Sequence, residues 1–166
     1  MDLISGVHPN LAHLSWMPGS WRGVGFVEFQ DGQRSDVEFT MELSSSGEEF
    51  LSYQLKAALI DIDGKPLEII LEESGTWFGQ APHAVRLQIG HHVSSYLPAI
   101  NVWTGKGITA GIEDAKITLA RVDLKFENHV RQYGIAQDQV LFSHALQFID
   151  ENSSIVQLEV IMQRVS

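Results

Sequence analysis

The stretch Gly19-Ser20-Trp21-Arg22-Gly23-Val24-Gly25 decides the fold of this chain. Its three glycines share one parity with the tryptophan between them. Glycine weakens a strand interior, so its repetition on one face indicates a strand that bends sharply while another backbone or ring packs against it. Small ligand-holding β-barrels often begin in this way. We therefore expect Gly19, Gly23, Gly25 and Trp21 to have structural roles.

Outward from this stretch, apolar and polar residues alternate with a period of two, most clearly over residues 37–43, 50–59 and 85–89. About ten strands are separated by turn signals such as Asp31-Gly32 and Asp63-Gly64. This pattern predicts an all-β fold, an antiparallel barrel like those of lipocalins or fatty-acid-binding proteins. Closure is favoured because it removes exposed strand edges. A two-sheet sandwich is the alternative architecture.

A short helical turn is expected before the first strand. Leu11 and Leu14 share one of its faces, Asn10 is its predicted cap, and Pro18 ends it. We expect this turn to plug or flank one end of the barrel. Further along the chain, residues 93–103 are predicted to hold two short strands.

Composition limits the function. The chain has 166 residues, of which 44% are hydrophobic and 19% charged, which predicts a single globular domain over residues 1–166. A net charge of -10 disfavours nucleic acid and anionic membranes as partners. The absence of cysteine excludes disulfides and thiolate metal sites, and no apolar run reaches the ~20 residues of a membrane helix. We expect a cytoplasmic protein whose oligomeric state stays open, a homodimer included.

Four parts of the sequence form a recognisable set: residues 8–25, residues 50–53 followed by 63–67, residues 73–77, and residues 157–164. The first contains the glycine-tryptophan motif, the third reads Glu-Ser-Gly-Thr-Trp, and the fourth reads Gln-Leu-Glu-Val-Ile-Met-Gln-Arg. Together they resemble the nitrobindin family of small β-barrels, and the resemblance spans most of the chain.

The resemblance implies ferric haem in the barrel, chemistry with nitric oxide, and isomerisation of peroxynitrite to nitrate. It also implies an iron-binding histidine at the position of Gln157 and a distal histidine at the position of Leu71. A glutamine amide is a poor ligand for ferric iron, and leucine offers no hydrogen bond. The two substitutions predict that the fold is retained and the haem chemistry is not, and no catalytic residue is assigned.

Among the histidines, His144 is the best candidate for the barrel interior, because its parity matches that of Val140 and Phe142. It is either a substitute ligand or polar anchor, or a buried histidine bonded to a neighbouring group. His91 and His92 are adjacent in a predicted strand and point to opposite faces, so they cannot easily chelate one ion. No metal site is predicted.

The first and last strands meet in barrels of this kind. We therefore expect Arg164 to stack on Trp21 and to donate hydrogen bonds to nearby carbonyls, which would seal the base of the barrel.

Taken together, the sequence favours a binding protein over an enzyme. The predicted function is to hold a small apolar or amphipathic ligand in the barrel. The alternative is a haem protein with an atypical ligand, which would act as a peroxynitrite isomerase or bind nitric oxide. A third possibility is a barrel filled by its own side chains.

Overall fold

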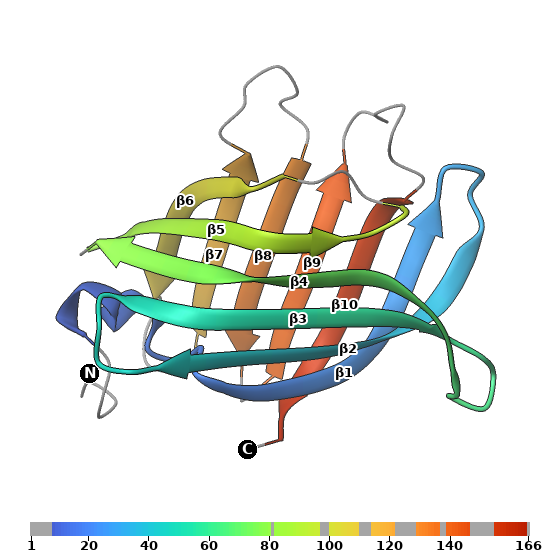
Figure 1. The fold of residues 1–166 in the computed structure, drawn as a ribbon, viewed down its shortest axis with the longest axis horizontal. Coiled ribbons are helices and arrows are strands. Elements are labelled where there is room, and N and C mark those ends of the chain that lie inside the picture. The colour runs from blue at the N-terminus through green and yellow to red at the C-terminus, as the bar shows by residue number, and fades with distance from the viewer. Residues whose placement is uncertain are drawn as a thin grey trace.

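Ten antiparallel strands form one closed barrel in the computed structural model of the chain (Figure 1). Each strand pairs with the next along the sequence, and β1 pairs with β10 to complete the ring. The strands are β1 Gly19–Phe29, β2 Arg34–Ser45, β3 Phe50–Ile60, β4 Pro66–Gln80, β5 Ala84–Val93, β6 Val102–Thr109, β7 Asp114–Arg121, β8 His129–Ala136, β9 Gln139–Leu146 and β10 Ile155–Arg164. The predicted antiparallel barrel is confirmed.

The structure describes residues 8–80, 82–96, 100–109, 114–121, 129–136, 139–146 and 155–165. Side chains are described for residues 8–80, 82–96, 100–107, 131–135 and 157–165. Over these ranges, no helix has the length and apolar character needed to cross a bilayer.

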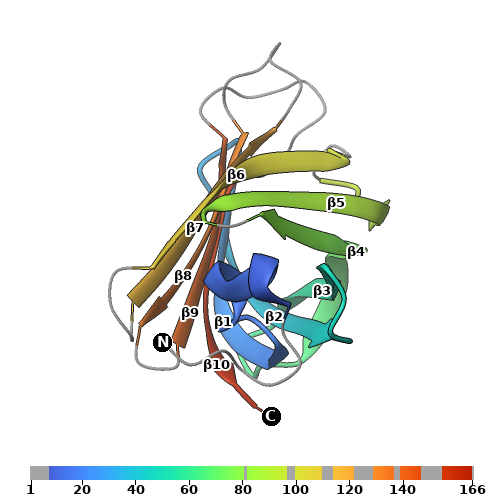
Figure 2. The same cartoon turned by 90° about the vertical axis from the view of Figure 1, so that its left-hand side faces the viewer.

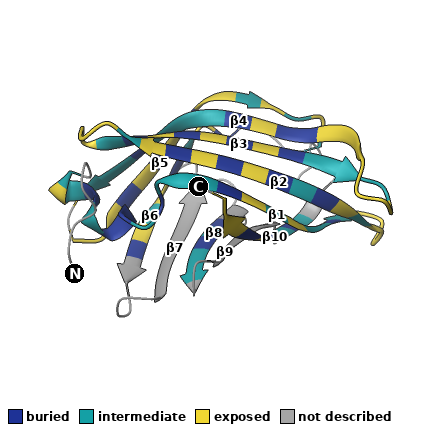
Figure 3. Ribbon diagram, turned by 90° about the horizontal axis from the view of Figure 1, so that it is seen from below, coloured by how far each residue is buried: buried dark blue, intermediate teal, exposed yellow. Residues whose placement is uncertain are grey.

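The core lies between two walls of the barrel. Figure 1 shows β2 to β5 crossing in front of β7 to β10 at a steep angle. Along β2 and β3, buried and exposed residues alternate, which Figure 3 shows as bands across the strands. The buried set of these two strands faces inward and consists of Val37, Phe39, Met41, Leu43, Leu51, Tyr53, Leu55 and Ala57.

The glycines of β1 allow the close approach that their parity predicts. A Cβ atom at Gly23 would lie 1.9 Å from the backbone oxygen of Ile161, and one at Gly25 would lie 1.8 Å from that of Glu159. Gly19 has a φ of 136°, a conformation that other residues rarely adopt. Strand β1 can therefore approach the backbone of β10 this closely only because Gly23 and Gly25 have no side chains.

A short 3-10 helix, η1 (Pro9–Leu14), packs against the barrel beside β4, as Figure 2 shows. Leu11 and Leu14 are fully buried, and a Cβ at Gly79 of β4 would lie 2.8 Å from the Asn10 oxygen. The predicted helical turn is thus present, but the expectation that Asn10 caps it is wrong. His8 is the cap, because its Nδ1 accepts a hydrogen bond from the Asn10 backbone N–H at 3.1 Å.

The two short strands expected over residues 93–103 are not found among the described residues. Strand β5 ends at Val93, β6 begins at Val102, and none of the described residues between these two is in a strand. The polar Gly90-His91-His92 run disguises the continuation of β5 to Val93 in the sequence, because it interrupts the apolar alternation.

The contact between Trp21 and Arg164 is present and closes the barrel. The two residues are direct partners across β1 and β10, and the guanidinium lies 4.2 Å from the centre of the indole ring. Arg164 also donates hydrogen bonds to the carbonyls of Pro18 and Trp16. The Trp21 indole donates to the Met17 carbonyl at 2.9 Å. These bonds tie the segment after η1 to the last strand.

We predict that Arg164→Ala lowers the free energy of unfolding by about 2 kcal/mol, since it removes the stacking on Trp21 and two carbonyl hydrogen bonds. Urea denaturation followed by circular dichroism measures the change. Arg22→Ala is the matched control, because its exposed ion pair with Glu38 should contribute less than ~1 kcal/mol. Equal losses of stability in the two variants would contradict the inference that Arg164 seals the base of the barrel.

Candidate functional site

Five polar side chains meet inside the barrel and form what we call the interior cluster: Tyr53, Glu73, His92, Arg131 and Tyr133. They come from β3, β4, β5 and β8. Glu73 is 2% exposed and Arg131 is 1% exposed. Because charged residues are almost never fully buried unless they are paired, this cluster is the feature of the interior that requires a functional or structural reason.

The carboxylate of Glu73 stands at the centre of the cluster. Arg131 donates two parallel hydrogen bonds to it, from Nη1 to Oε1 at 2.8 Å and from Nη2 to Oε2 at 3.0 Å. The Tyr53 hydroxyl donates to Oε1 at 3.2 Å, and His92 Nδ1 lies 3.1 Å from Oε2. Since a carboxylate only accepts, the His92 ring is the donor in that contact.

Strand alternation explains how the β4 and β8 members of the cluster reach the interior. On β4, Glu73 shares the inner face with Leu71 and Trp77, all of them buried. On β8, Arg131 and Tyr133 are two residues apart, so they also lie on one face.

A bulge in β5 explains the position of His92. Gly75 of β4 pairs with Ile89, whereas the preceding residue of β4 pairs with His91, so Gly90 is an extra residue in β5. Before the bulge, the inward-facing residues of β5 have odd numbers, and after it they have even numbers. His92 therefore lies on the inner face in place of His91. The prediction that the two histidines point to opposite faces agrees with their exposures, since His91 is exposed and His92 is half-buried. The alternation of the sequence does not indicate which of the two faces inward, because it does not reveal the bulge.

Aromatic rings surround the cluster. Trp77 packs edge-to-face against Tyr53 and Tyr133, with ring centres 6.0 and 5.2 Å apart. The Arg131 guanidinium lies 4.8 Å from the centre of the Trp103 ring. The cation is thus held between a carboxylate and an indole face, where little water can screen either contact.

The protonation states of the cluster follow from these contacts. Burial alone would raise the pKa of Glu73, but the Arg131 charge and the hydrogen bonds from His92 and Arg131 outweigh it and hold that pKa well below its usual range. Burial raises the pKa of Tyr53 and of Tyr133. The cluster therefore combines an ionised carboxylate, a charged guanidinium and two neutral phenols.

Two of the residues nominated from the sequence lie on different faces. Leu71 is fully buried on the inner face of β4. In β10 the buried residues Leu158 and Val160 occupy even positions, whereas Gln157 occupies an odd one. The Gln157 side-chain amide donates a hydrogen bond to the Glu159 carboxylate at 3.0 Å. Gln157 therefore lies on the outer face of the barrel, and Leu158 occupies the neighbouring inner position.

The side chain of His144 lies outside the described residues. The backbone register pairs His144 with Arg131 on one side and with Leu158 on the other. Its inward orientation stays a prediction.

Sequence reasoning missed the interior cluster. Arg131 and Tyr133 have the right spacing for one face of a strand, but an arginine in a strand is usually exposed. In the sequence, Glu73 stands out only as the first residue of the Glu-Ser-Gly-Thr-Trp stretch. The sequence does contain a signal for the cluster. On each of two predicted strands, a charged residue lies at a position whose alternation places it on the inner face, and a buried charge requires a partner in the interior.

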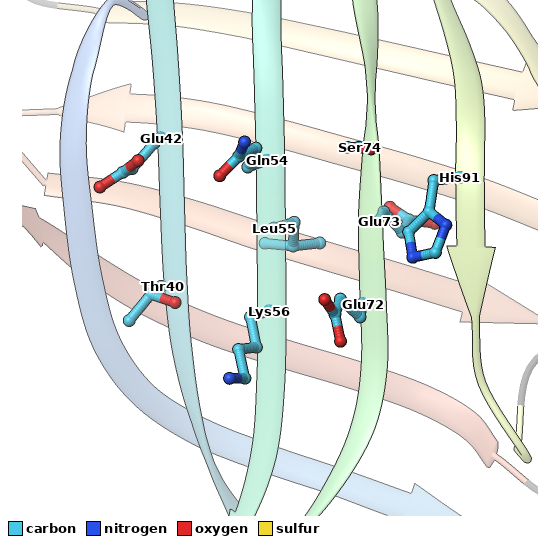
Figure 4. A pocket seen from close by; sticks show the side chains of 9 residues that line it. All are labelled: Thr40, Glu42, Gln54, Leu55, Lys56, Glu72, Glu73, Ser74 and His91. Carbon is cyan, nitrogen blue, oxygen red and sulfur yellow. The ribbon is translucent and has the colours of Figure 1, made fainter.

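An open depression on the outside of the barrel is a weaker candidate. Its volume is about 340 Å³. The residues that line it come from β2 to β5, as Figure 4 shows. Most of its lining is exposed and polar: Thr40, Glu42, Gln54, Lys56, Glu72 and His91. Within the described part of the chain, no group of three or more acidic, histidine or cysteine side chains has the arrangement of a metal site. The interior cluster is therefore the better site.

A closed ten-stranded antiparallel barrel with a polar cluster among buried aromatic rings is the architecture of a small-ligand β-barrel. The model of the family described as the THAP4-like, heme-binding beta-barrel domain matches residues 10–153. This chain belongs to that family, and the resemblance to nitrobindins is confirmed.

Individual relatives agree with this membership. A peroxynitrite isomerase of Streptomyces griseus is 28% identical over 142 residues, which are 84% of this chain and 75% of that protein. A ferric nitrobindin-like protein of Thermobifida fusca is 32% identical over 73 residues, which are 44% of this chain. The matches to this protein and to a ferric nitrobindin-like protein of Streptomyces griseus span only 41% and 40% of those relatives.

The fold has a solved counterpart. The crystal structure of Rv2717c from M. tuberculosis superimposes with a TM-score of 0.72 at 21% sequence identity, and the alignment covers 99% of this chain and 100% of that one.

Proposed function

We propose that this chain holds a small apolar or amphipathic ligand inside the barrel, beside the interior cluster and the Trp77 indole that packs against it. The observation that supports this function best is the buried pair of Glu73 and Arg131. Replacing such a pair by apolar residues is often neutral or stabilising, so its presence in a barrel of a ligand-binding family favours a role in recognition.

The proposal includes the absence of an axially ligated haem, because the inner side chains that the structure describes do not fit one. At the two positions that resemble the haem-contacting histidines, Leu71 has no ligating atom and Gln157 is turned to the outer face. The buried Tyr53 and Tyr133 have raised pKa values, which disfavours the tyrosinate that iron binds. His92 is engaged with Glu73.

A haem titration tests this part of the proposal. Ferric haem added to the purified protein should produce no sharp, stoichiometric change of the Soret band. Gln157→Ala and His144→Ala should leave the spectrum as it is in the unaltered protein. A one-to-one Soret change that either variant abolishes would contradict the proposal and identify the ligand.

The ligand-binding part is tested with Nile red, an uncharged amphipathic dye. Saturable one-to-one binding is expected from its fluorescence, and Leu71→Phe should weaken it about tenfold because the added ring occupies interior volume. Ile69→Phe is the matched control, since Ile69 lies two residues away and is 48% exposed. Equal effects of the two variants would place the dye outside the barrel.

The second candidate function is a haem protein with peroxynitrite isomerase activity. It is favoured by the description of the family and by the name of the relative from Streptomyces griseus. The same haem titration decides between the two candidates.

A further inference from the structure

The donors around Glu73 form a complete anion-binding set. A guanidinium fork, a phenol and an imidazole N–H all donate to one carboxylate, at distances of 2.8 to 3.2 Å. The fork contacts both carboxylate oxygens, which is the geometry that gives arginine its preference for carboxylates. These donors come from β8, β3 and β5, whereas the carboxylate comes from β4. The set would therefore remain assembled around any carboxylate in that place.

The Trp77 indole provides a further buried donor next to this set. Trp77 is fully buried, and its Nε1 has no hydrogen-bond partner among the described residues. Its ring packs against Tyr53 and Tyr133, both members of the interior cluster. A buried N–H without an acceptor is unfavourable, and a ligand oxygen at this place would satisfy it.

We infer that the interior cluster is an anion site which the chain fills with its own carboxylate, Glu73, so that the ligand carries an uncharged acceptor group that binds the Trp77 indole. The statement about the ligand rests on the proposed function, whereas the anion site does not. Glu73 repels a ligand carboxylate and already occupies the guanidinium fork. A ketone, ester or amide oxygen meets no such repulsion and can accept the Trp77 hydrogen bond.

Chemical rescue tests the anion site. Glu73→Ala removes the internal carboxylate and leaves its donors, so acetate should bind there. At about ten times its dissociation constant, acetate should raise the melting temperature of Glu73→Ala by about 4 °C over sodium chloride of equal ionic strength. Glu72→Ala is the matched control, because Glu72 lies on the exposed face of the same strand and should show no acetate-specific shift.

Two results overturn the anion site: equal responses of Glu73→Ala to acetate and chloride, or the same acetate response in Glu72→Ala. Should Glu73→Ala be unfolded at 25 °C, the readout becomes recovery of its near-ultraviolet circular dichroism. Recovery with acetate supports the site, and no recovery overturns it.

Calorimetry with dodecan-2-one and dodecanoate at pH 8 tests the ligand class. The unaltered protein should bind the ketone at least ~10-fold more tightly than the carboxylate, and Glu73→Gln should remove this preference. Trp77→Phe should weaken ketone binding about fivefold, as expected for one lost hydrogen bond. Equal binding of both compounds by the unaltered protein overturns the ligand class. If neither compound binds, the proposed function fails, while acetate rescue still decides the anion site.

Discussion

Arg131→Met should lower the free energy of unfolding by about 3–5 kcal/mol, because it leaves the Glu73 carboxylate buried without its counter-charge. The partner is 2% exposed, so water cannot replace the two hydrogen bonds that the guanidinium donates. The side-chain volume is nearly preserved in this substitution, and the loss therefore reports the charge rather than a cavity. Urea denaturation at pH 7, followed by tryptophan fluorescence, measures it.

Two control variants separate the buried pair from ordinary surface charge. The double variant with Arg131→Met and Glu73→Gln should regain a large part of the lost stability, since no buried charge remains. Arg22→Met breaks an exposed pair with Glu38 and should cost less than ~1 kcal/mol. A loss below ~1 kcal/mol for Arg131→Met would contradict the account of the pair.

The same pair makes stability depend on acid. The pKa of Glu73 is lowered in the folded protein, so the unfolded chain takes up a proton at a higher pH than the folded one does. The stability that this group contributes is fully present above the ordinary carboxyl pKa, about 4. It is lost as the pH falls toward the lowered value. Glu73→Gln should flatten this acid decline, and Glu72→Gln, on the exposed face, should not.

The architecture could be predicted because its determinants are local. The shared parity of Gly23 and Gly25 indicates the curvature of β1, and alternation along the chain indicates the number of strands. The contact of Arg164 with Trp21 follows once the first and last strands are taken to be neighbours. Each of these inferences requires only the strand period and the order of the strands.

The site depends instead on register, which a single residue can change. The extra Gly90 in β5 moves His92 inside, and nothing in the local pattern distinguishes that glycine from an ordinary strand residue. A shift of one position separates Gln157 on the outer face from Leu158 on the inner face. A resemblance in sequence therefore predicts the presence of a strand more reliably than it predicts which face of the strand one residue occupies.

The interior cluster also explains why charge appears where an apolar core is expected. Glu73 and Arg131 belong to strands on opposite walls, and each would be unfavourable in the interior without the other. Together they connect β4 to β8 through a geometry that tolerates little displacement, because both hydrogen bonds of the fork must form at once. The pair thus fixes how the two walls face each other.

The second large effect is expected at the glycine motif. Gly25→Ala should lower the free energy of unfolding by about 3 kcal/mol or more, because the new Cβ would lie 1.8 Å from the Glu159 backbone oxygen and 2.6 Å from the Val160 Cα. These are backbone atoms, so no side-chain rotation relieves the clash. Strands β1 and β10 must separate, and the ladder that closes the barrel is disturbed along with them.

Gly90→Ala is the matched control for this substitution, since a Cβ at Gly90 meets nothing within 4 Å. Its stability should change by no more than ~1 kcal/mol, with a small gain from the reduced freedom of the unfolded chain. Thermal unfolding followed by circular dichroism compares the two variants at one pH. If both lose stability equally, close approach of β10 does not set the curvature of β1, and the glycine parity in this strand has another cause. If only Gly25→Ala is affected, the motif acts through closure of the barrel, because Gly90→Ala makes the same exchange at a position with free space around it.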